Sequence, residues 1–105
     1  MTFGEAITQA RKGLKLSQKE VAASTMKEDG AAISAQYLND IEHDRRNPPS
    51  ELIIRQLART LQLDDDYLFF LAGRFPSDVL ELSPDQEGVT SAMRAFRRNL
   101  RRDRP

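Results

Sequence analysis

The sequence predicts an all-α fold, and three observations support that prediction. Apolar residues recur at intervals of three and four along nearly the whole chain, and no stretch alternates convincingly with a period of two. Ser or Asp precedes several of these periodic segments, where helix N-caps are expected. Clusters containing Pro or Gly separate the segments. A chain of 105 residues, 39% of them hydrophobic, suits one domain plus a short appendage.

The first helix is predicted at residues 3–12. Gly13 follows it as a residue that tolerates the left-handed conformation at a helix end. Apolar side chains spaced by four, three and four residues give this segment one apolar face. They are Phe3, Ile7, Ala10 and Leu14.

The second helix is predicted to start after Ser17 and to end near Thr25. Ser17 precedes Glu20 by three residues, the spacing of a capping box, in which each side chain bonds the other residue's backbone N–H. Val21 and Ala22 supply the buried side of this short helix.

A polar segment containing Gly, from Thr25 to Ala32, is predicted to be a loop. Ser34 follows it as the expected N-cap of a third helix. The apolar residues of this third helix are Tyr37, Leu38 and Ile41. Its remaining surface carries small and amide side chains, so it is the helix of functional interest.

The fourth helix is predicted to begin at Ser50 and Glu51, because Pro48 and Pro49 remove backbone donors and fix φ. A broad apolar stripe indicates the face of this helix that packs in a core. The stripe consists of Leu52, Ile53, Leu57, Ala58 and Leu61.

The fifth helix is predicted at about residues 66–72 and is ended by Gly73 and Pro76. Residues 64–66 are all Asp, which places negative charge at the positive end of the helix dipole. Three consecutive carboxylates lack the ligand spacing of a calcium loop, so a capping role is favoured over a metal site.

A sixth helix is predicted at about residues 84–101. Ser83, Pro84 and Gln86 fit an N-cap, a first-turn proline and a box partner. Its narrow apolar seam, spaced for pairing with one other helix, consists of Val89, Met93, Phe96 and Leu100. We therefore expect a domain at residues 1–76, then a linker and amphipathic helix at residues 77–105 that is suited to dimerisation.

Composition gives little global evidence about partners. Sixteen basic residues balance sixteen acidic ones, so any surface for nucleic acid must be a local patch on a neutral body. The chain has no cysteine and no apolar run of membrane or signal-peptide form. The expected location is therefore the cytoplasm, without a disulfide framework or a thiolate metal site.

An enzyme is not expected, and no catalytic residue, metal site or cofactor is predicted. The chain offers one His and no plausible set of nucleophile, base and orienting group. A helix-terminal or solvated role is favoured for His43 over a metal ligand or a pH switch. Four aromatic side chains in the fifth helix and the segment after it are expected in the core or on a docking surface. They are Tyr67, Phe69, Phe70 and Phe75.

Four motifs in order make residues 3–72 similar to the lambda-repressor-like domain of Cro/CI (XRE) transcription regulators. The motifs run from Leu16 to Ala22, from Ile33 to Glu42, from Arg45 to Pro48, and from Leu57 to Leu61. The resemblance covers two-thirds of the chain. It implies a five-helix domain whose third helix enters the major groove of DNA while the second crosses the DNA backbone.

The resemblance also implies a role for each matching position. Gln18 would contact a phosphate and steady Gln36. The base-facing positions of the third helix are Ser34, Ala35, Gln36 and Asn39, and the positions that hold the DNA backbone are Tyr37, Arg45, Arg46 and Asn47. Amide side chains suit an adenine edge, and an Ala methyl suits a thymine methyl. Asp40 fits less easily, since a carboxylate repels phosphates unless it accepts from a cytosine amino group or pairs with an arginine.

The sequence departs from the family pattern between Ala22 and Ser34, where about six extra residues lie. The loop could bulge outward without changing the packing of the two helices, or the second helix could run longer. The contact between Gln18 and Gln36 depends on which of these holds.

Two functions remain open from the sequence. The first is a homodimeric regulator, a repressor, that binds a pseudo-palindromic DNA operator and dimerises through the last helix. The second is an antitoxin-like or adaptor protein whose last helix binds a partner protein, with DNA binding secondary. The arginine-rich C-terminal segment is compatible with both and is too short to enclose a sizeable ligand pocket.

Overall fold

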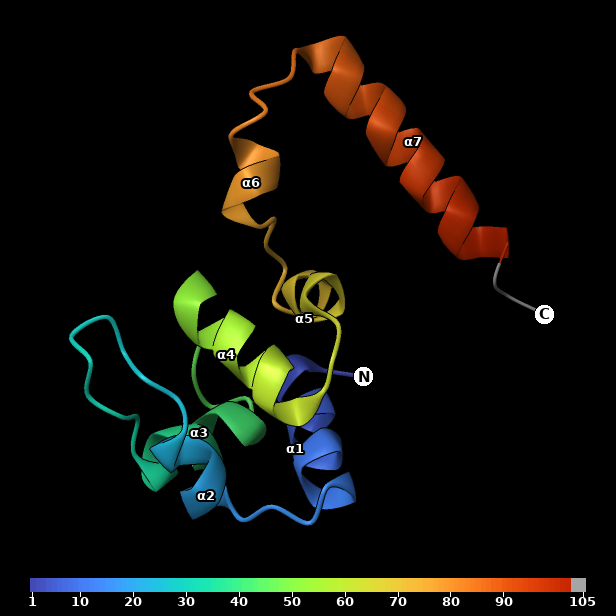
Figure 1. Cartoon of the computed structure of the whole chain (residues 1–105). Helices are drawn as coiled ribbons and strands as arrows, with labels where there is room; N and C mark the ends of the chain where they lie inside the picture. Colours follow the sequence, from blue (N-terminus) through green and yellow to red (C-terminus); the bar gives the residue numbers. More distant parts are fainter. Residues whose placement is uncertain (103–105) are drawn as a thin grey trace.

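The computed structural model describes residues 1–102, which form α-helices joined by turns and one small hairpin (Figure 1). The all-α prediction is confirmed for this part of the chain. The helices are α1 (Phe3–Gly13), α2 (Gln18–Ala23), α3 (Ala35–Glu42), α4 (Glu51–Leu61), α5 (Asp65–Leu71), α6 (Ser77–Leu80) and α7 (Gln86–Arg102). Residues 103–105, the end of the predicted C-terminal segment, lie outside the described residues.

Each of the first five helices begins at a side chain that accepts a backbone N–H of its first turn. These N-caps are Thr2, Ser17, Ser34, Ser50 and Asp64. The predicted starts of α2, α3 and α4 are therefore confirmed, and the capping role of the aspartate run is confirmed at Asp64. The cap of α1 was not predicted from the sequence: Thr2 and Glu5 form a second capping box.

Helices α1 to α5 share one hydrophobic core. Helix α3 packs against α1 and α2, and α4 packs against α1 and α5. The buried apolar side chains are Phe3, Ala6, Ile7, Val21, Ala22, Ile33, Leu38, Ile41, Ile53, Ile54, Leu57, Ala58, Leu61, Leu68 and Phe69. We call this unit the body, residues 1–73.

The stripe predicted on α4 is wrong at one position. Leu52 is 43% exposed, and Ile54, which was not in the predicted stripe, is fully buried. At 3.6 residues per turn, Ile54 shares a face with Leu57 and Leu61, whereas Leu52 lies on the opposite side of the helix.

Two predicted helix ends are also corrected. Gly13 lies within α1, and Lys15 has the left-handed conformation instead, with φ of 60°. Helix α2 ends at Ala23, short of Thr25. The chain turns there to enter the hairpin, and the buried Thr25 hydroxyl donates to the Val21 carbonyl oxygen at 2.8 Å.

The six-residue insertion forms a short antiparallel hairpin that leads into α3. Met26 and Ala32 make an isolated bridge, and the N–H of Lys27 donates to the Ala31 carbonyl at 2.8 Å. Gly30 turns the tip with φ of 87°, a conformation that side chains disfavour. The insertion therefore bulges outward and leaves α2 short, which is one of the two arrangements that the sequence allowed.

The C-terminal arm, residues 74–102, extends away from the body (Figure 1). The predicted linker contains the short helix α6, and α7 begins at Gln86, two residues later than predicted. Ser83 has φ of 45°, so it lacks the extended geometry of an N-cap. The Asp85 carboxylate accepts from the N–H of Gly88 at 2.8 Å and takes the capping place. Among the described residues, no helix has the length and apolar character needed to span a membrane.

Candidate nucleic-acid interface

Helix α3 presents a polar outer face over an apolar inner face. Leu38 and Ile41 are buried against α1 and α2, whereas Ser34, Ala35 and Gln36 are exposed. Asn39, Tyr37 and Asp40 lie at the margins of the outer face and are half-buried. The first turn of α3 is therefore the part of the helix that a large flat partner can reach.

Gln18 connects the start of α2 to the far half of α3. Its Nε2 donates to Asn39 Oδ1 and to Glu42 Oε1, both at 3.0 Å. The expected contact between Gln18 and Gln36 is absent among these bonds. Gln36 lies on the outer side of α3, while Asn39 and Glu42 lie on the side that faces α2 and α1, so Gln18 steadies Asn39 instead.

A buried ion pair fastens α3 to α1. Arg11 donates from Nε to Glu42 Oε2 at 2.7 Å and from Nη2 to Glu42 Oε1 at 3.0 Å, and the two side chains are 12% and 2% exposed. A third Arg11 nitrogen donates to the Leu16 carbonyl oxygen at 3.0 Å. The bidentate pair fixes the angle of α3 relative to the rest of the body.

The pair shifts the pKa of both groups. Burial alone would raise the pKa of Glu42, but hydrogen bonds from Arg11 and Gln18 and the Arg11 charge outweigh it, so the pKa lies below its ordinary value. The hydrogen bond to Glu42 raises the pKa of Arg11. The sequence holds a signal for this pair: Leu38, Ile41 and Glu42 share one helical face, and a carboxylate on a core face needs a cation.

Three side chains contact Asp40 on the exposed side of α3. Asp40 Oδ1 accepts from Gln36 Nε2 at 3.0 Å and lies 3.7 Å from Arg45 Nη1, while Asp40 Oδ2 lies 3.5 Å from Arg46 Nε. The Arg46 guanidinium also stacks over the Tyr37 ring, 5.0 Å from its centroid. The sequence left the role of Asp40 open between a base contact and an arginine pair, and the arginine pair is the contact present.

The segment that follows α3 is anchored on α1. Asp44 accepts from the Thr2 hydroxyl at 2.7 Å and from the N–H of Gly4 at 3.0 Å. A Cβ on Gly4 would lie 2.5 Å from the Glu42 carbonyl oxygen, so only glycine allows this approach. His43 is the C-cap of α3, as expected of a helix-terminal histidine. These contacts hold Arg45, Arg46 and Asn47 beside the outer face of α3.

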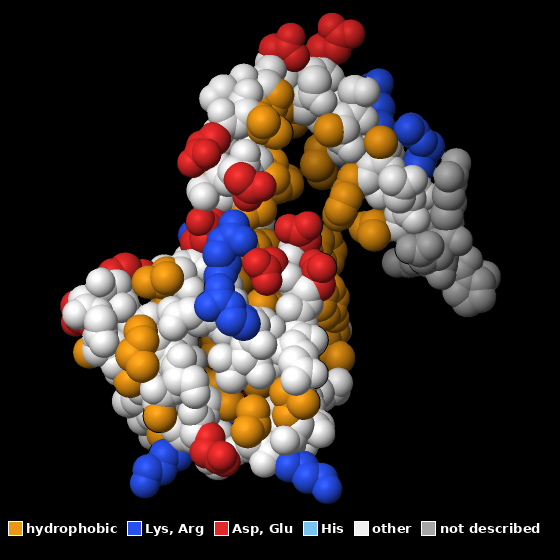
Figure 2. Space-filling model, viewed as in Figure 1, with side chains coloured by type: hydrophobic (Ala, Val, Ile, Leu, Met, Phe, Trp, Pro, Cys, Tyr) orange, Lys and Arg blue, Asp and Glu red, His pale blue; other side chains and the backbone are white. Residues whose placement is uncertain are grey.

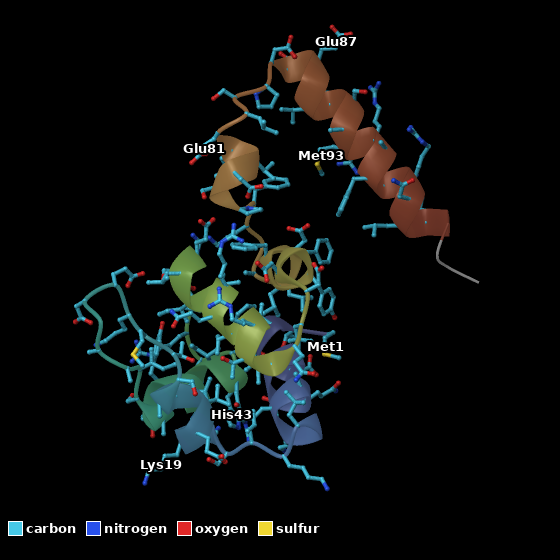
Figure 3. All side chains as sticks on the ribbon, viewed as in Figure 1. Met1, Lys19, His43, Glu81, Glu87 and Met93 are labelled. Carbon is cyan, nitrogen blue, oxygen red and sulfur yellow. The ribbon has the colours of Figure 1, made fainter. Side chains whose placement is uncertain are left out.

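The DNA-binding residues proposed from the sequence come from the start of α2, from α3 and its N-cap, and from the segment after α3. Figure 3 shows Lys19 of α2, and His43 directly after α3, in the part of the body away from the C-terminal arm. Asn47 is exposed and lines a shallow hollow with Thr2, Arg46 and Pro48. The capped helix α3 thus carries exposed small and amide side chains, and the two arginines follow in the segment after its end.

The model of a helix-turn-helix domain family matches residues 4–74. The chain belongs to this helix-turn-helix family. Its Cro/CI-like character and its fold of five helices plus a C-terminal helical extension agree with the prediction. A solved structure titled SinR protein/SinI protein complex aligns over 90% of this chain and 79% of that chain, with 22% sequence identity and a TM-score of 0.53. At that identity the likeness concerns the fold alone. No curated protein matches the chain significantly.

In this helix-turn-helix protein, the predicted dimerisation seam is open to solvent. Val89, Phe96 and Leu100 are 42–46% exposed, and Met93 is half-buried. Apolar side chains gather on the inner side of the arch that α6 and α7 form (Figure 2), and Met93 points into that arch (Figure 3). The Phe96 ring reaches Phe70 of α5, with 6.0 Å between ring centroids.

The aromatic residues of α5 and the segment after it divide between the core and the solvent-exposed surface. Phe69 is buried, whereas Tyr67, Phe70 and Phe75 are 42–58% exposed. The core position expected for these aromatics is confirmed for Phe69, and a docking role for the three exposed ones stays a prediction. Among the described residues, no group of three or more His, Asp or Glu side chains is placed to hold a metal ion.

Proposed function

We propose that the chain is a sequence-specific DNA-binding repressor that acts in the cytoplasm and binds a pseudo-palindromic operator through α3. The observation behind this proposal is the outer face of α3, where exposed Ser34, Ala35 and Gln36 stand beside Arg45 and Arg46. A neutral chain needs such a local basic edge to reach DNA, because its total charge gives no general attraction.

Each side chain of this face has a role that its chemistry suits. Gln36 and Asn39 form paired hydrogen bonds with adenine edges, Ser34 bonds a base edge or sugar, and the Ala35 methyl packs on a thymine methyl. The backbone contacts come from Tyr37, Arg45, Arg46 and Asn47, which hold the phosphates and set the register. The Gln18 amide, expected from the sequence to contact a phosphate, donates both of its Nε2 hydrogens to Asn39 and Glu42 and has none left for one. No base contact is assigned to the hairpin, whose tip carries Glu28 and Asp29.

The protein acts as a homodimer in this proposal. The seam of Val89, Met93, Phe96 and Leu100 leaves apolar area in water that a second copy of α7 would cover. Because the arm leaves the body at the end opposite α3, two arms can pair while both α3 helices face DNA (Figure 1). Two-fold symmetry then places the recognition helices about one helical turn of DNA apart.

A second candidate function is binding of a partner protein by the arm, with DNA binding secondary. The same open seam supports it, and the aligned SinR structure was solved with a second protein, SinI. The two functions differ in what α7 contacts and in whether α3 selects a DNA sequence.

Selection of bound sequences from a random DNA pool, using the purified full chain, tests the primary function. We expect enrichment of a motif with two-fold symmetry. Enrichment of no sequence would contradict a sequence-specific regulator and would favour the partner-binding function. Enrichment of a single asymmetric half-site would retain DNA recognition but contradict the dimer.

Two substitutions then separate base reading from backbone binding. We expect Gln36→Ala to relax preference at one base pair per half-site, with a loss of about 1–3 kcal/mol of discrimination. Arg46→Ala should weaken binding to all sequences and flatten the salt dependence. Gln9→Ala, which removes an exposed amide from α1, is the control and should change neither property. Titrations of matched and single-mismatch duplexes at several salt concentrations measure both effects; equal weakening on every duplex by Gln36→Ala would show that Gln36 reads no base.

A further inference from the structure

Asp40 is the one acidic side chain placed among the proposed DNA-contacting groups of α3. Its carboxylate is 18% exposed and accepts from Gln36 Nε2 at 3.0 Å on one oxygen. The Arg45 and Arg46 guanidinium groups approach to 3.7 and 3.5 Å. A carboxylate in this place repels phosphates, so its presence is unfavourable for DNA affinity as such.

The hydrogen bond to Asp40 orients the Gln36 amide. A glutamine side chain has three rotatable bonds and two amide orientations, and donation of one Nε2 hydrogen to a fixed carboxylate restricts all of them. The oxygen Oε1 and the second Nε2 hydrogen then remain free. One acceptor beside one donor is the pattern that pairs with the N6 amino group and N7 of adenine.

The ion pairs of Asp40 act on the two arginines. Each guanidinium that pairs with Asp40 carries part of its charge in a protein contact, so its attraction to any phosphate is reduced. Arg46 keeps its position even without the carboxylate, because it stacks on the Tyr37 ring. Asp40 therefore weakens non-specific DNA binding and leaves the base-reading contacts intact.

From these contacts we infer that Asp40 is a specificity-determining positioning residue: it holds the Gln36 amide in its adenine-reading orientation and lowers the affinity of Arg45 and Arg46 for non-cognate DNA. This inference rests on the proposed function, since it assigns a regulator of selectivity to the same α3 surface. In this role Asp40 neither contacts a base nor stabilises the helix; it acts through Gln36, Arg45 and Arg46.

Two substitutions at Asp40 separate its two effects. Asp40→Asn removes the charge but keeps an oxygen that accepts from Gln36 Nε2, whereas Asp40→Ala removes both. The backbone bond from the N–H of Arg45 to the Asp40 carbonyl, 2.9 Å long, is unaffected by either change. A carboxylate in the second half of α3 also opposes the helix dipole, so both variants should fold. The control is Asp66→Asn, which removes an exposed charge from α5.

The measurements are affinities of the full chain for its selected operator, for operators changed at one base pair, and for unrelated duplex DNA across a salt series. Both Asp40 variants should bind unrelated DNA about tenfold more tightly at 0.1 M salt, with the salt slope steeper by about 0.9. Only Asp40→Ala should also lose about fivefold or more of discrimination, at the base pair that Gln36 reads. The Asp66→Asn control should leave all three quantities unchanged.

Three results would overturn the inference. Unchanged affinity and discrimination in both variants would show that Asp40 is merely a surface carboxylate. Loss of preference at a base pair other than that of Gln36 in Asp40→Asn would make Asp40 a base reader in its own right. Failure of the unmodified chain to select any DNA sequence would remove the proposed function and this inference with it, and is recognised without the variants.

Discussion

The body and the C-terminal arm use apolar residues in opposite ways. In the body, fifteen apolar side chains are buried and each of the five helices has a side-chain cap. In the arm, α6 has no buried residue, and the apolar seam of α7 is about half exposed. A helix of 17 residues that buries little is marginal in water. The body is therefore complete as a folded unit, whereas α7 gains most of its stability from whatever covers its seam.

Polar contacts hold the start of the arm on the body. Ser77 donates from its N–H and its hydroxyl to the Glu51 carboxylate at 2.6 and 2.7 Å. Arg74 donates to the Pro49 carbonyl at 2.7 Å, and these bonds lie at the junction of α4 and α6. The hydrogen bonds from Ser77 lower the pKa of Glu51. These bonds give the arm a defined direction relative to the body. The two regions therefore differ in packing: the body has a hydrophobic core, and the arm has none of its own.

The largest effect is expected from charges on the α7 seam, which test whether the arm, unlike the body, depends on a second copy of the chain. Phe96→Asp together with Leu100→Asp puts two carboxylates where a partner helix would pack, so the dimer should dissociate. The body should melt as before, since neither side chain belongs to its core. Monomers should bind a full operator about 10²–10⁴-fold more weakly while they keep nearly normal affinity for a half-site. Sedimentation and operator titration measure the two effects.

Thr90→Asp together with Ser91→Asp is the matched control, because it adds the same charge outside the seam of the same helix. This variant should stay dimeric. A dimer that persists in the seam variant, or a monomer with undiminished operator affinity, would refute the role given to α7. Dimerisation would then have to use the body, or the seam would have a different partner.

The next effect, on the body alone, is expected from the pair of Arg11 and Glu42. Glu42→Gln leaves a buried guanidinium without its counter-charge, so the free energy of unfolding should fall by about 3–5 kcal/mol. Asp65→Asn, which breaks an exposed ion pair with Arg55, should cost less than about 1 kcal/mol. Urea denaturation of both variants measures the difference. Equal small losses would show that the buried pair does not fasten α3.

The pH dependence of stability identifies Glu42 more directly. Its pKa in the folded protein lies below its ordinary value of 4.5, so its contribution is complete above pH 4.5 and is lost as the pH falls through the folded pKa. The stability difference between the unmodified protein and Glu42→Gln should therefore be constant near neutral pH and shrink below pH 4.5. Glu20, Glu28 and Glu51 also have lowered pKa values, but they titrate in both proteins and cancel in the difference. A difference that stays constant down to pH 2 would exclude this assignment.

Local signals in the sequence predicted the body well. The caps Ser17, Ser34 and Ser50 act on N–H groups three residues away, so their pattern is visible in a short window of sequence. The last helix, predicted at about residues 84–101, corresponds to α7 and starts two residues later than predicted. The sequence indicated Ser83 as its N-cap, whereas Asp85 takes that place. Both residues are good caps, and only the backbone conformation at Ser83 distinguishes them.

Contacts between distant residues were predicted less well. The expected bond between Gln18 and Gln36 is replaced by bonds to Asn39 and Glu42, because the choice depends on the rotation of α3 about its own axis. Arg11 donates to Glu42, 31 residues away, and the place of Glu42 on the core face of α3 indicates that a cation is needed without showing which one. The DNA-binding role of Gln36 and its neighbours remains a proposal that rests on their exposure and chemistry.

The smallest effect is expected from the hairpin, an exposed segment that resembles the arm in being held by polar contacts. The Gln56 amide accepts from the N–H of Met26 at 2.8 Å and donates to the Met26 carbonyl at 2.7 Å, and it lies on α4. Gln56→Ala should cost about 1 kcal/mol, since two hydrogen bonds are exchanged for bonds to water. Replacing residues 27–30 by a two-residue turn keeps the Gln56 clamp and changes loop closure by about 0.6 kcal/mol or less, and it exchanges the exposed bond from the Ser50 hydroxyl to Glu28 for a bond to water, so its cost should also stay within about 1 kcal/mol. Thermal melting followed by circular dichroism measures both variants. Loss of helical content or of a cooperative transition in the shortened chain would show that the hairpin tip, and not only its clamped base, is needed to seat α3 on the body.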